Sequence, residues 1–233
     1  IASNSLGVAS NNVELILINI NLESAITEDY FTSAFDKAYD LGAKVINCSW
    51  GGASLSQTLS DKIEQLKNNG VSVVFASGNG DANEIAINLD ENENDDESES
   101  EFVLGVGATS IYNDVTNYSN YGSAIDILAP GGDSTLGVLS LDLLGNDGYN
   151  PYPLTNYYIE GNNLVNYNYS FTAGTSFAAP TVSGVIALML SENPDLTPDE
   201  IRTILIETAD KIQSDTVTYT DLSTDNTDST VHT

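Results

Sequence analysis

The sequence predicts an α/β fold, a doubly wound parallel β-sheet with helices on both faces, in three α/β/α layers. Its 233 residues, 41% of them hydrophobic, are enough for one globular domain with a core of its own. Short, nearly continuous apolar runs alternate along the chain with longer segments of helical periodicity. Because such an order requires right-handed crossover connections, it favours parallel strands that are covered by helices.

The strands are expected where apolar and β-branched residues form short runs. Runs of this kind are typical of strands that are buried on both faces of a sheet. Four buried strands are predicted at VELILINI, KVINCSW, VSVVFAS and FVLGVGATS, residues 13–20, 44–50, 71–77 and 102–110. Two shorter strands bounded by turns are predicted at AIDILAPGGD and TLGVLSLDL, residues 124–133 and 135–143.

Two helices are expected between the first three strands. Residues 27–43 carry apolar side chains at helical spacing, with Thr27 as N-cap and Gly42 as C-cap. Residues 54–70 repeat this design and end at Gly70. Each helix would connect two neighbouring strands of the sheet.

Two further helices are expected toward the C-terminal end. Residues 175–192 are apolar on nearly all sides, which is typical of a helix buried at the centre of a domain. In residues 194–210, Thr197 is a candidate N-cap, Pro198 stands at the first helical position, and Glu200 follows three residues after the cap. This pattern predicts a capping box on a peripheral amphipathic helix.

The composition is strongly acidic, with 34 Asp and Glu against 6 Lys and Arg and a formal net charge of -28. This charge argues against nucleic acid and anionic membranes as partners, and it suits an extracellular or secreted protein. No stretch approaches the roughly 18 uninterrupted apolar residues of a membrane span. The single cysteine, Cys48, excludes an intrachain disulfide, and its apolar strand favours a buried, inert thiol.

Three regions are expected to lie outside the regular elements. The run DENENDDESESE, residues 90–101, holds eight acids in twelve residues and is predicted to be a solvated loop. It lacks the spacing of an EF-hand loop, so no metal or cofactor is expected there. Residues 145–168 are expected to form a surface hairpin or loop, and residues 214–233 a polar tail that follows a domain at residues 1–213.

Ser176 stands between small residues at the start of the predicted helix, in FTAGTSFAAPTVSGVIALML. There the backbone N–H groups and the helix dipole favour developing negative charge. Ala178 and Ala179 keep the first turn thin, and Pro180 is expected to be tolerated because first-turn N–H groups are unpaired. Two roles are open for Ser176: a helix cap, the commoner role of serine before a helix, or the nucleophile of acyl transfer.

The segment GTSFAAPTVSG, residues 174–184, resembles the active-serine motif of the subtilisin-like serine proteases, the subtilase family. It agrees with G-T-S-[MF]-A-A-P-x-V-[AS]-G at every specified position. Three more segments resemble the family in the same order, VINCSWGG, VVFASGNG and NYSNYGSAIDILAPGG, at residues 45–52, 73–80 and 117–132. The resemblance covers nearly all of residues 7–210 and implies the subtilisin-like form of the three-layer fold.

The resemblance also implies site residues. Ser176 would be the nucleophile, and Asn79 would donate its side-chain amide, beside the Ser176 backbone N–H, to the oxyanion. Without the resemblance, Asn79 would be interpreted as a turn residue between glycines. Two segments would clamp an extended peptide as an added strand and wall the first specificity pocket: Ser49, Trp50 and Gly51 on one side, and Ala76, Ser77 and Gly78 on the other. Trp50 is either a bulky wall of this cleft or a core tryptophan.

The family's catalytic triad runs Asp, His, Ser along the chain, and the first two have no counterpart in this sequence. The only histidine, His232, follows the serine in the polar tail and is a poor substitute. The opening IASNSLGVASNNVELILINI resembles the stretch that follows the family's histidine motif, H-G-T-x-V-A-G. We therefore expect residues 1–213 to be a partial catalytic domain, with the Asp and the His on an upstream segment of the same protease.

The leading hypothesis is the C-terminal two-thirds of a secreted serine endopeptidase that hydrolyses peptide bonds through an acyl-enzyme on Ser176. Its partners would be a peptide or protein substrate in extended conformation and the upstream segment, without which this chain would be inactive. The alternative is a catalytically inactive, subtilase-like peptide-binding module. An unrelated doubly wound binding domain would require four ordered motif matches to be coincidence. The motifs D-[ST]-G and H-G-T-x-V-A-G, upstream of Ile1, would distinguish the first two.

Overall fold

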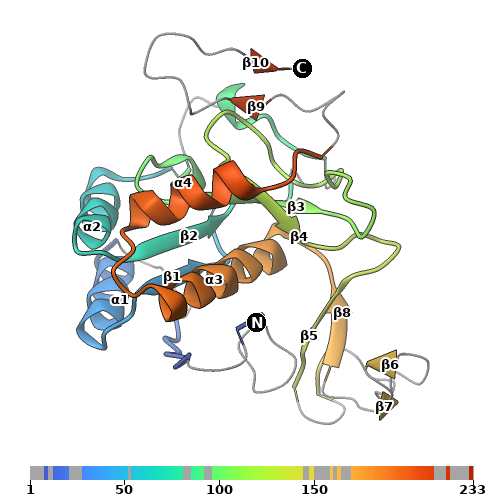
Figure 1. The fold of residues 1–233 in the computed structure, drawn as a ribbon, viewed down its shortest axis with the longest axis horizontal. Helices are drawn as coiled ribbons and strands as arrows, with labels where there is room; N and C mark the ends of the chain where they lie inside the picture. Colours follow the sequence, from blue (N-terminus) through green and yellow to red (C-terminus); the bar gives the residue numbers. More distant parts are fainter. Residues whose placement is uncertain are drawn as a thin grey trace.

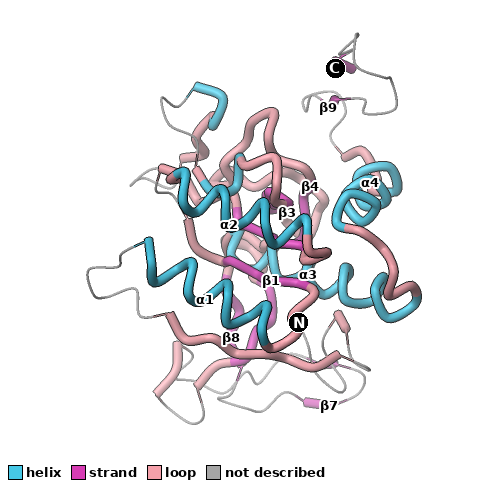
Figure 2. The backbone as a smooth tube through the Cα atoms, turned by 90° about the vertical axis from the view of Figure 1, so that its left-hand side faces the viewer, coloured by secondary structure: helices cyan, strands magenta, loops and turns pink. Residues whose placement is uncertain are grey.

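The computed structural model describes most of the chain. The described residues are 8–9, 13–20, 28–51, 54–80, 85–91, 96–143, 147–149 and 169–212, together with the backbone of four two-residue strands. Figure 1 shows a central sheet between helices, and Figure 2 shows the same layers from the side.

In the described part of the chain, a four-stranded parallel sheet forms the middle layer. Its strands, in spatial order, are β1 (Val45–Cys48), β2 (Ser72–Ala76), β3 (Leu104–Thr109) and β4 (Ile127–Pro130). One face is covered by α1 (Glu28–Asp40) and α2 (Gln57–Asn68), the other by α3 (Thr175–Glu192) and α4 (Pro198–Thr208) (Figure 2). The predicted three-layer α/β/α fold with helices on both faces is confirmed.

Successive residues of the central strands point into two separate cores. Val73 and Phe75 of β2 face α1 and α2, whereas Val74 and Ala76 face α3 and α4. This alternation follows from the period of two in a strand, and it explains why the sequence runs are apolar at consecutive positions. Although α3 is apolar on most sides, no helix among the described residues has both the length and the apolar character of a membrane span.

Glycine ends α1 and α2 as predicted. Gly42 and Gly70 have φ of +87° and +79°, which L side chains rarely adopt. At the end of α1, the N–H of Gly42 donates to Tyr39 O (2.8 Å) and that of Ala43 to Ala38 O (3.0 Å), the pair of bonds in a Schellman motif. The same pair follows α2. The predicted N-cap Thr27 lies outside the described residues.

The capping box of α4 is also confirmed. The N–H of Glu200 donates to Thr197 Oγ1 (3.3 Å), and the N–H of Thr197 donates to Glu200 Oε2 (2.9 Å). These bonds hold the pKa of the exposed Glu200 carboxyl below its ordinary value, because they stabilise its charged form. At α2 the cap is Ser56, so that helix begins three residues later than predicted.

The prediction of a buried strand at residues 13–20 is wrong. In the described part of the chain this segment pairs with no strand, and its side chains are half-buried or exposed, with Leu15 61% and Leu17 83% exposed. A strand needs a hydrogen-bonding neighbour, and in the described sheet β1 is an edge strand that pairs only with β2. The apolar sequence of residues 13–20 therefore indicates that the segment could form a strand. It does not show whether a neighbouring strand is there to pair with it.

The acidic run is also only partly a solvated loop. Its described residues form the 3₁₀ turns η1 (Leu89–Glu91) and η2 (Glu97–Glu99), and in η2 the residues Glu97 and Ser98 are buried. Asp96 caps η2 through a capping box with Glu99, so the backbone of this turn is satisfied locally. Local capping and packing against β2 and β3 outweigh the polar composition here.

Smaller antiparallel pairs lie outside the sheet. β5 (Val138–Leu141) pairs with β8 (Tyr169–Thr172), and this pair extends below the sheet in Figure 1 before the chain enters α3. β6 (Tyr158–Ile159) pairs with β7 (Asn162–Asn163), and β9 (Tyr219–Thr220) with β10 (Val231–His232). Other residues of the predicted loop 145–168 and tail 214–233 lie largely outside the described chain, and the domain boundary at 213 stays a prediction.

Candidate active site

The carboxyl ends of three sheet strands converge on the N-terminus of α3. Ser49 follows β1, Asn79 follows β2, and Gly131 follows β4. Each contacts the residues that open α3: the Gly174 N–H donates to Gly131 O (2.9 Å), and Ser49 and Asn79 bond to the two residues after it. In open α/β sheets this edge is where ligands bind. The predicted catalytic residues Ser176 and Asn79 therefore lie in one place.

Ser176 is the second residue of α3 and not its cap. The N-cap position belongs to Gly174, which has φ of +146° and no side chain to accept a bond. A Cβ built there would stand 3.3 Å from Asn79 Nδ2, so glycine also allows the close approach of Asn79. With the capping position occupied, the half-buried Ser176 hydroxyl is left for another role.

The Ser176 hydroxyl and carbonyl both bond to Ser49. Ser176 Oγ donates to Ser49 O (3.2 Å), and Ser49 Oγ donates to Ser176 O (2.8 Å). The second bond has a cause in the sequence, because Pro180 has no N–H and cannot give Ser176 O its usual helical bond. Pro180 is the sixth residue of α3, so the expectation that it falls among unpaired first-turn N–H groups is wrong. Ser49 supplies the missing donor.

Thr175 fixes the orientation of the Asn79 amide. Asn79 Oδ1 accepts from the Thr175 N–H (2.8 Å) and from Thr175 Oγ1 (2.9 Å), while the Gly78 N–H donates to Thr175 Oγ1 (3.2 Å). A backbone N–H can only donate, so the atom that faces it must be the amide oxygen. The Nδ2 donor group is therefore turned away from Thr175, and none of the described residues accepts a bond from it.

Two buried polar residues that support this geometry were missed by the sequence analysis. Thr175 is 0% exposed. The signal in the sequence that could have identified it is that a polar residue stands at the start of an otherwise apolar helix. Asn120 Oδ1 accepts from the N–H groups of Gly80 (2.9 Å) and Ile87 (3.0 Å), and the Asn120 N–H donates to Gly78 O (3.1 Å). Asn120 therefore holds the loop that carries Asn79.

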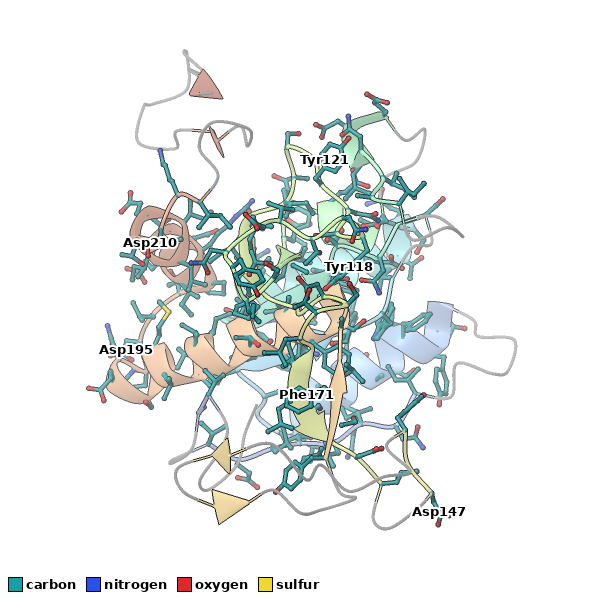
Figure 3. All side chains as sticks on the ribbon, turned by 90° about the vertical axis from the view of Figure 1, so that its right-hand side faces the viewer. Tyr118, Tyr121, Asp147, Phe171, Asp195 and Asp210 are labelled. Atoms are coloured by element: carbon teal, nitrogen blue, oxygen red, sulfur yellow. The ribbon has the colours of Figure 1, made fainter. Side chains whose placement is uncertain are left out.

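The tyrosine at position 118 supports the other side of the helix start. Tyr118 Oη donates to Gly132 O (2.6 Å), in the same turn that receives the Gly174 N–H. Figure 3 shows Tyr118 above the end of β8 and Phe171 within that strand. Burial raises the pKa of Tyr118, so its hydroxyl stays protonated and serves as a donor.

The six residues predicted to line the cleft lie on two adjacent segments. A Cβ built on the exposed Gly51 would stand 4.0 Å from Ala76 O. The buried Ser77 hydroxyl donates to Asn120 O (3.2 Å), and Gly78 is half-buried. The Trp50 ring stacks on Phe31 (centroids 4.4 Å apart) and meets Phe75 edge-on (5.1 Å). These contacts agree with the interpretation of Trp50 as a core residue. The two segments would therefore meet a peptide chiefly through backbone and small side chains, with the Ser49 carbonyl beside Ser176.

Among the described residues, Ser176 Oγ has no hydrogen-bond partner that could act as its base. The acceptor of its hydroxyl, Ser49 O, is an amide carbonyl, which does not take up a proton at neutral pH. His232 lies in β10, whose partner is β9, and Figure 1 shows this pair beyond α4. Burial, with a smaller contribution from Glu97, raises the pKa of the Cys48 thiol, which excludes a thiolate there. Among the described residues, no group of three or more His, Cys, Asp or Glu could hold a metal ion.

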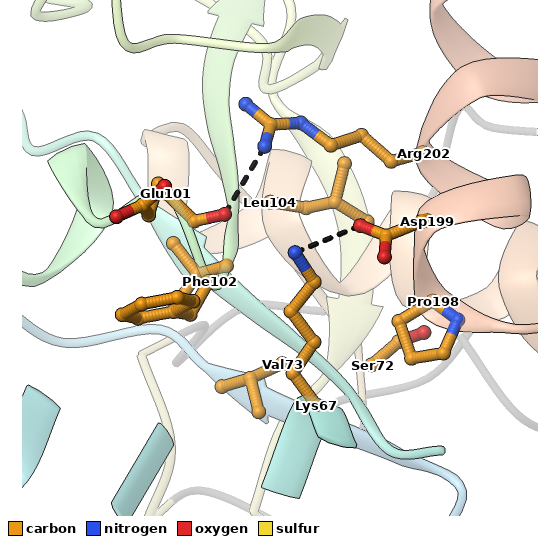
Figure 4. A pocket seen from close by; sticks show the side chains of 10 residues that line it. Lys67, Ser72, Val73, Glu101, Phe102, Leu104, Pro198, Asp199 and Arg202 are labelled. Atoms are coloured by element: carbon orange, nitrogen blue, oxygen red, sulfur yellow. Dashed lines mark hydrogen bonds and ion pairs between the residues drawn. The ribbon is translucent and has the colours of Figure 1, made fainter. Parts of the chain in front are cut away.

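A small pocket at the opposite edge of the sheet is held by ion pairs. It lies where β2 and β3 begin, and Figure 4 shows Lys67 paired with Asp199 (2.7 Å) and Arg202 bonded to Glu101 O (3.2 Å). Arg202 Nε also bonds to the buried Asp126 (2.8 Å). Burial raises the pKa of Asp126 even with Arg202 beside it. These pairs attach α4 to α2 and to the residue that precedes β4.

A family model described as the subtilase family, peptidase S8, matches residues 2–231. The chain belongs to the subtilase family. It is 30% identical over 188 residues to fervidolysin of Fervidobacterium pennivorans, covering 79% of this chain and 24% of that protein. It is 30% identical over 218 residues to a thermophilic serine proteinase of Bacillus sp. (strain AK1), covering 94% and 45%.

Solved structures agree with the fold. The crystal structure of fervidolysin superposes with a TM-score of 0.60 at 28% identity, covering 78% of this chain and 25% of that one. A cold adapted subtilisin-like serine proteinase gives a TM-score of 0.56 at 26% identity, covering 78% and 55%. The subtilisin-like three-layer fold is therefore confirmed. This chain spans less than half the length of the two curated relatives described above.

Proposed function

We propose that this chain carries the nucleophile and the oxyanion-binding groups of a secreted serine endopeptidase. The observation that carries the proposal is the placement of Ser176 in the first turn of α3, beside an Asn79 amide that Thr175 orients. Ser176 Oγ would give its proton to the histidine of the complete protease and attack the carbonyl carbon of a peptide bond. The C–N bond then breaks, the amine leaves with that proton, and the acyl group stays on Ser176 as an ester. Water would hydrolyse this ester to a carboxylic acid and the free serine.

The oxyanion of the tetrahedral intermediate would accept bonds from two donors. These are Asn79 Nδ2 and the Ser176 backbone N–H, which belongs to the first helical turn and has no helical acceptor. A donor of this kind is typically worth about 3 kcal/mol of barrier, a figure that comes from a subtilisin. Because Thr175 and the loop around Asn120 are already in place, little reorganisation is needed when the charge develops.

The substrate would be a peptide or protein segment in extended conformation. It would pair with the backbone of residues 49–51 as an added strand, with residues 76–78 on its other side. Gly51 is exposed, which leaves room for a peptide to approach. The acyl group of such a peptide would end beside Ser176, because Ser49 contacts that residue directly.

The Asp and His of the triad would come from a segment that is not in this sequence. Two observations support this part of the proposal: the chain covers 24% and 45% of two related proteases, and the side chains of Leu15 and Leu17 are largely exposed. An upstream segment that pairs with the free side of β1 and covers these leucines would bring a histidine to Ser176. Secretion is supported by the acidic composition and by relatives named extracellular protease and cell wall-associated protease.

Peptide hydrolysis by the complete protease tests the proposal. Ser176→Ala should abolish turnover, and Asn79→Ala should lower kcat by about 10²–10³ with little change in KM, since its donor acts only in the transition state. Ser191→Ala, an exposed serine in the same helix, is the matched control and should behave as wild type. Peptide binding with no turnover in the wild-type protein would instead establish the inactive peptide-binding module.

A further inference from the structure

Asn79 is followed by a glycine that its loop cannot exchange for another residue. Gly80 has φ of +80°, which L side chains rarely adopt. A Cβ built on Gly80 would also clash with the backbone carbonyl of Ile85. The proposed oxyanion donor is therefore tied to an Asn–Gly sequence, because the chemistry requires the asparagine and the loop requires the glycine.

An Asn–Gly sequence can lose the side-chain amide by deamidation. The backbone nitrogen of the glycine loses its proton and bonds to Cγ of the asparagine, and ammonia leaves with that proton. Water then opens the cyclic imide to aspartate or isoaspartate. Glycine has no Cβ to hinder the attack, and asparagine is among the thermolabile residues for this kind of reason. The sequence contains two such pairs, Asn69–Gly70 and Asn79–Gly80.

The structure holds both groups that would have to react at Asn79. The Gly80 N–H donates to Oδ1 of the buried Asn120 (2.9 Å). Asn79 Oδ1 accepts from the Thr175 N–H (2.8 Å) and from Thr175 Oγ1 (2.9 Å). Attack requires the Gly80 nitrogen to leave Asn120 and the Asn79 side chain to leave Thr175. The exposed Asn79 should therefore deamidate more slowly in the folded protein than in the unfolded chain.

The aspartate product would fit the loop but not the proposed chemistry. An ionised aspartate has two acceptor oxygens and no donor. One oxygen can keep both bonds from Thr175, since these bonds need only an acceptor. The other oxygen would bring a negative charge to the place of the Asn79 Nδ2 donor, and it would repel the oxyanion. The loss in kcat should be at least that of removing one oxyanion donor.

We propose that Asn79 is a deamidation site whose conversion inactivates the protease, and that Asn120 slows this conversion by holding the Gly80 N–H. The inactivation rests on the proposed function, in which Asn79 supplies an oxyanion donor. Asn120 acts through the loop and touches no reacting atom of the substrate. It is therefore a positioning residue, and it also determines how long the donor survives.

Peptide mass mapping of the complete protease, with Ser176→Ala to prevent self-digestion, measures conversion of Asn79 in mildly alkaline buffer. Conversion should be at least about tenfold slower in the folded protein than in urea, because several hydrogen bonds must break first. Asn120→Ala should accelerate it about three- to tenfold in the folded protein. Asn120→Asp keeps an acceptor for the Gly80 N–H and should stay near the wild-type rate.

Asn69 is the internal reference in the same samples. The Gly70 N–H donates to Lys67 O, so its bond does not involve Asn120. Conversion of Asn69 should therefore be unchanged in Asn120→Ala. If both sites accelerate together, the variant has unfolded, and Thr175→Val, which frees Asn79 from one bond, takes its place. Equal rates for Asn79 in folded and unfolded protein, or no acceleration at Asn79 in the folded variant, overturn the role of Asn120.

Turnover tests the consequence of the modification. Activity per fluorophosphonate-reactive Ser176 should fall in proportion to the Asn79 converted, and Asn79→Asp should have a kcat lower by at least about 10²–10³. Conversion without loss of turnover overturns the inactivation. Mass mapping needs no turnover, so it decides the deamidation site even in a protein that does not label. There the proposed function has failed, and the Asn120→Ala rates alone support or overturn the site.

Discussion

Replacing Thr175 by valine removes one hydroxyl and preserves the shape of the side chain. In the structure Asn79 Oδ1 accepts from both the N–H (2.8 Å) and the Oγ1 (2.9 Å) of Thr175. Valine keeps the first bond and loses the second. Asn79 should therefore remain at the site but with its amide less firmly oriented toward the oxyanion.

The size of the effect follows from these contacts. Loss of a whole oxyanion donor raises the barrier by about 3 kcal/mol, so loss of one of two bonds that orient it should raise the barrier by about half of this. That corresponds to a decrease in kcat on the order of tenfold. The Gly78 N–H also loses its acceptor, which should lower the free energy of unfolding by about 1–3 kcal/mol.

Steady-state kinetics of the complete protease and urea unfolding measure the two effects. Thr175→Ser keeps the hydroxyl and should retain a kcat near that of wild type. In an Asn79→Ala background, Thr175→Val should lower kcat little further, because its effect passes through Asn79. A kcat for Thr175→Val within about twofold of wild type, or the full tenfold loss in the Asn79→Ala background, would refute this reasoning.

Three further predictions concern stability and reactivity. Arg202→Leu leaves the buried Asp126 without its guanidinium partner and should lower the free energy of unfolding by about 3–5 kcal/mol in urea. The bonds from Thr197 lower the pKa of the Glu200 carboxyl from its ordinary value of 4.5. Above pH 4.5, wild type should therefore have a larger free energy of unfolding than Glu200→Gln. This difference should disappear as the pH falls through the lowered pKa of Glu200 in the folded protein. Cys48, buried and with a raised pKa, should react with a disulfide reagent at about pH 8 only after unfolding.

Each of these has a result that would contradict it. Lys62→Ala breaks a pair with a largely exposed Asp36 and should cost at most about 1 kcal/mol, and an equally small loss for Arg202→Leu would show that α4 does not depend on its ion pair. Parallel pH profiles for wild type and Glu200→Gln would show that the capping carboxylate contributes nothing. Rapid reaction of Cys48 in the folded protein would show that β1 opens to solvent.

The elements that could be predicted from the sequence are those whose signals are local. Strands β2 and β3 are buried on both faces, so nearly every residue in them is apolar and the runs are unambiguous, whereas β1, predicted as a buried strand, is only partly buried and exposes Asn47. Two helix ends were equally clear, because the Gly42 turn and the Thr197–Glu200 box are built from neighbours in sequence, whereas the start of α2 was predicted three residues too early.

What could not be predicted depends on contacts between distant segments. An apolar run at residues 13–20 carries no information on whether a strand lies beside it. The acidic composition of residues 90–101 predicted a solvated loop and gave no sign that Glu97 is buried. Its burial follows from the packing of η2 against the sheet. The support that Thr175 gives to Asn79 joins residues 96 positions apart, and only the fold brings them together.

The site was predicted in part. The local sequence and the family resemblance together predicted Ser176 and Asn79 as site residues. In the structure both lie at the start of α3. The reciprocal bonds between Ser49 and Ser176 could not be foreseen, although Pro180 was a signal that Ser176 O would need another donor.

The proposed activity requires that Ser176 is a nucleophile and that its base comes from another segment. Reaction with a fluorophosphonate, followed by peptide mass mapping, measures this directly in this chain alone and in the complete protease. We predict a single adduct on Ser176 in the complete protease, lost in Ser176→Ala, and labelling of this chain alone that is slower by several orders of magnitude. No adduct on Ser176 in the complete protease, or equal labelling of both proteins, would contradict the account.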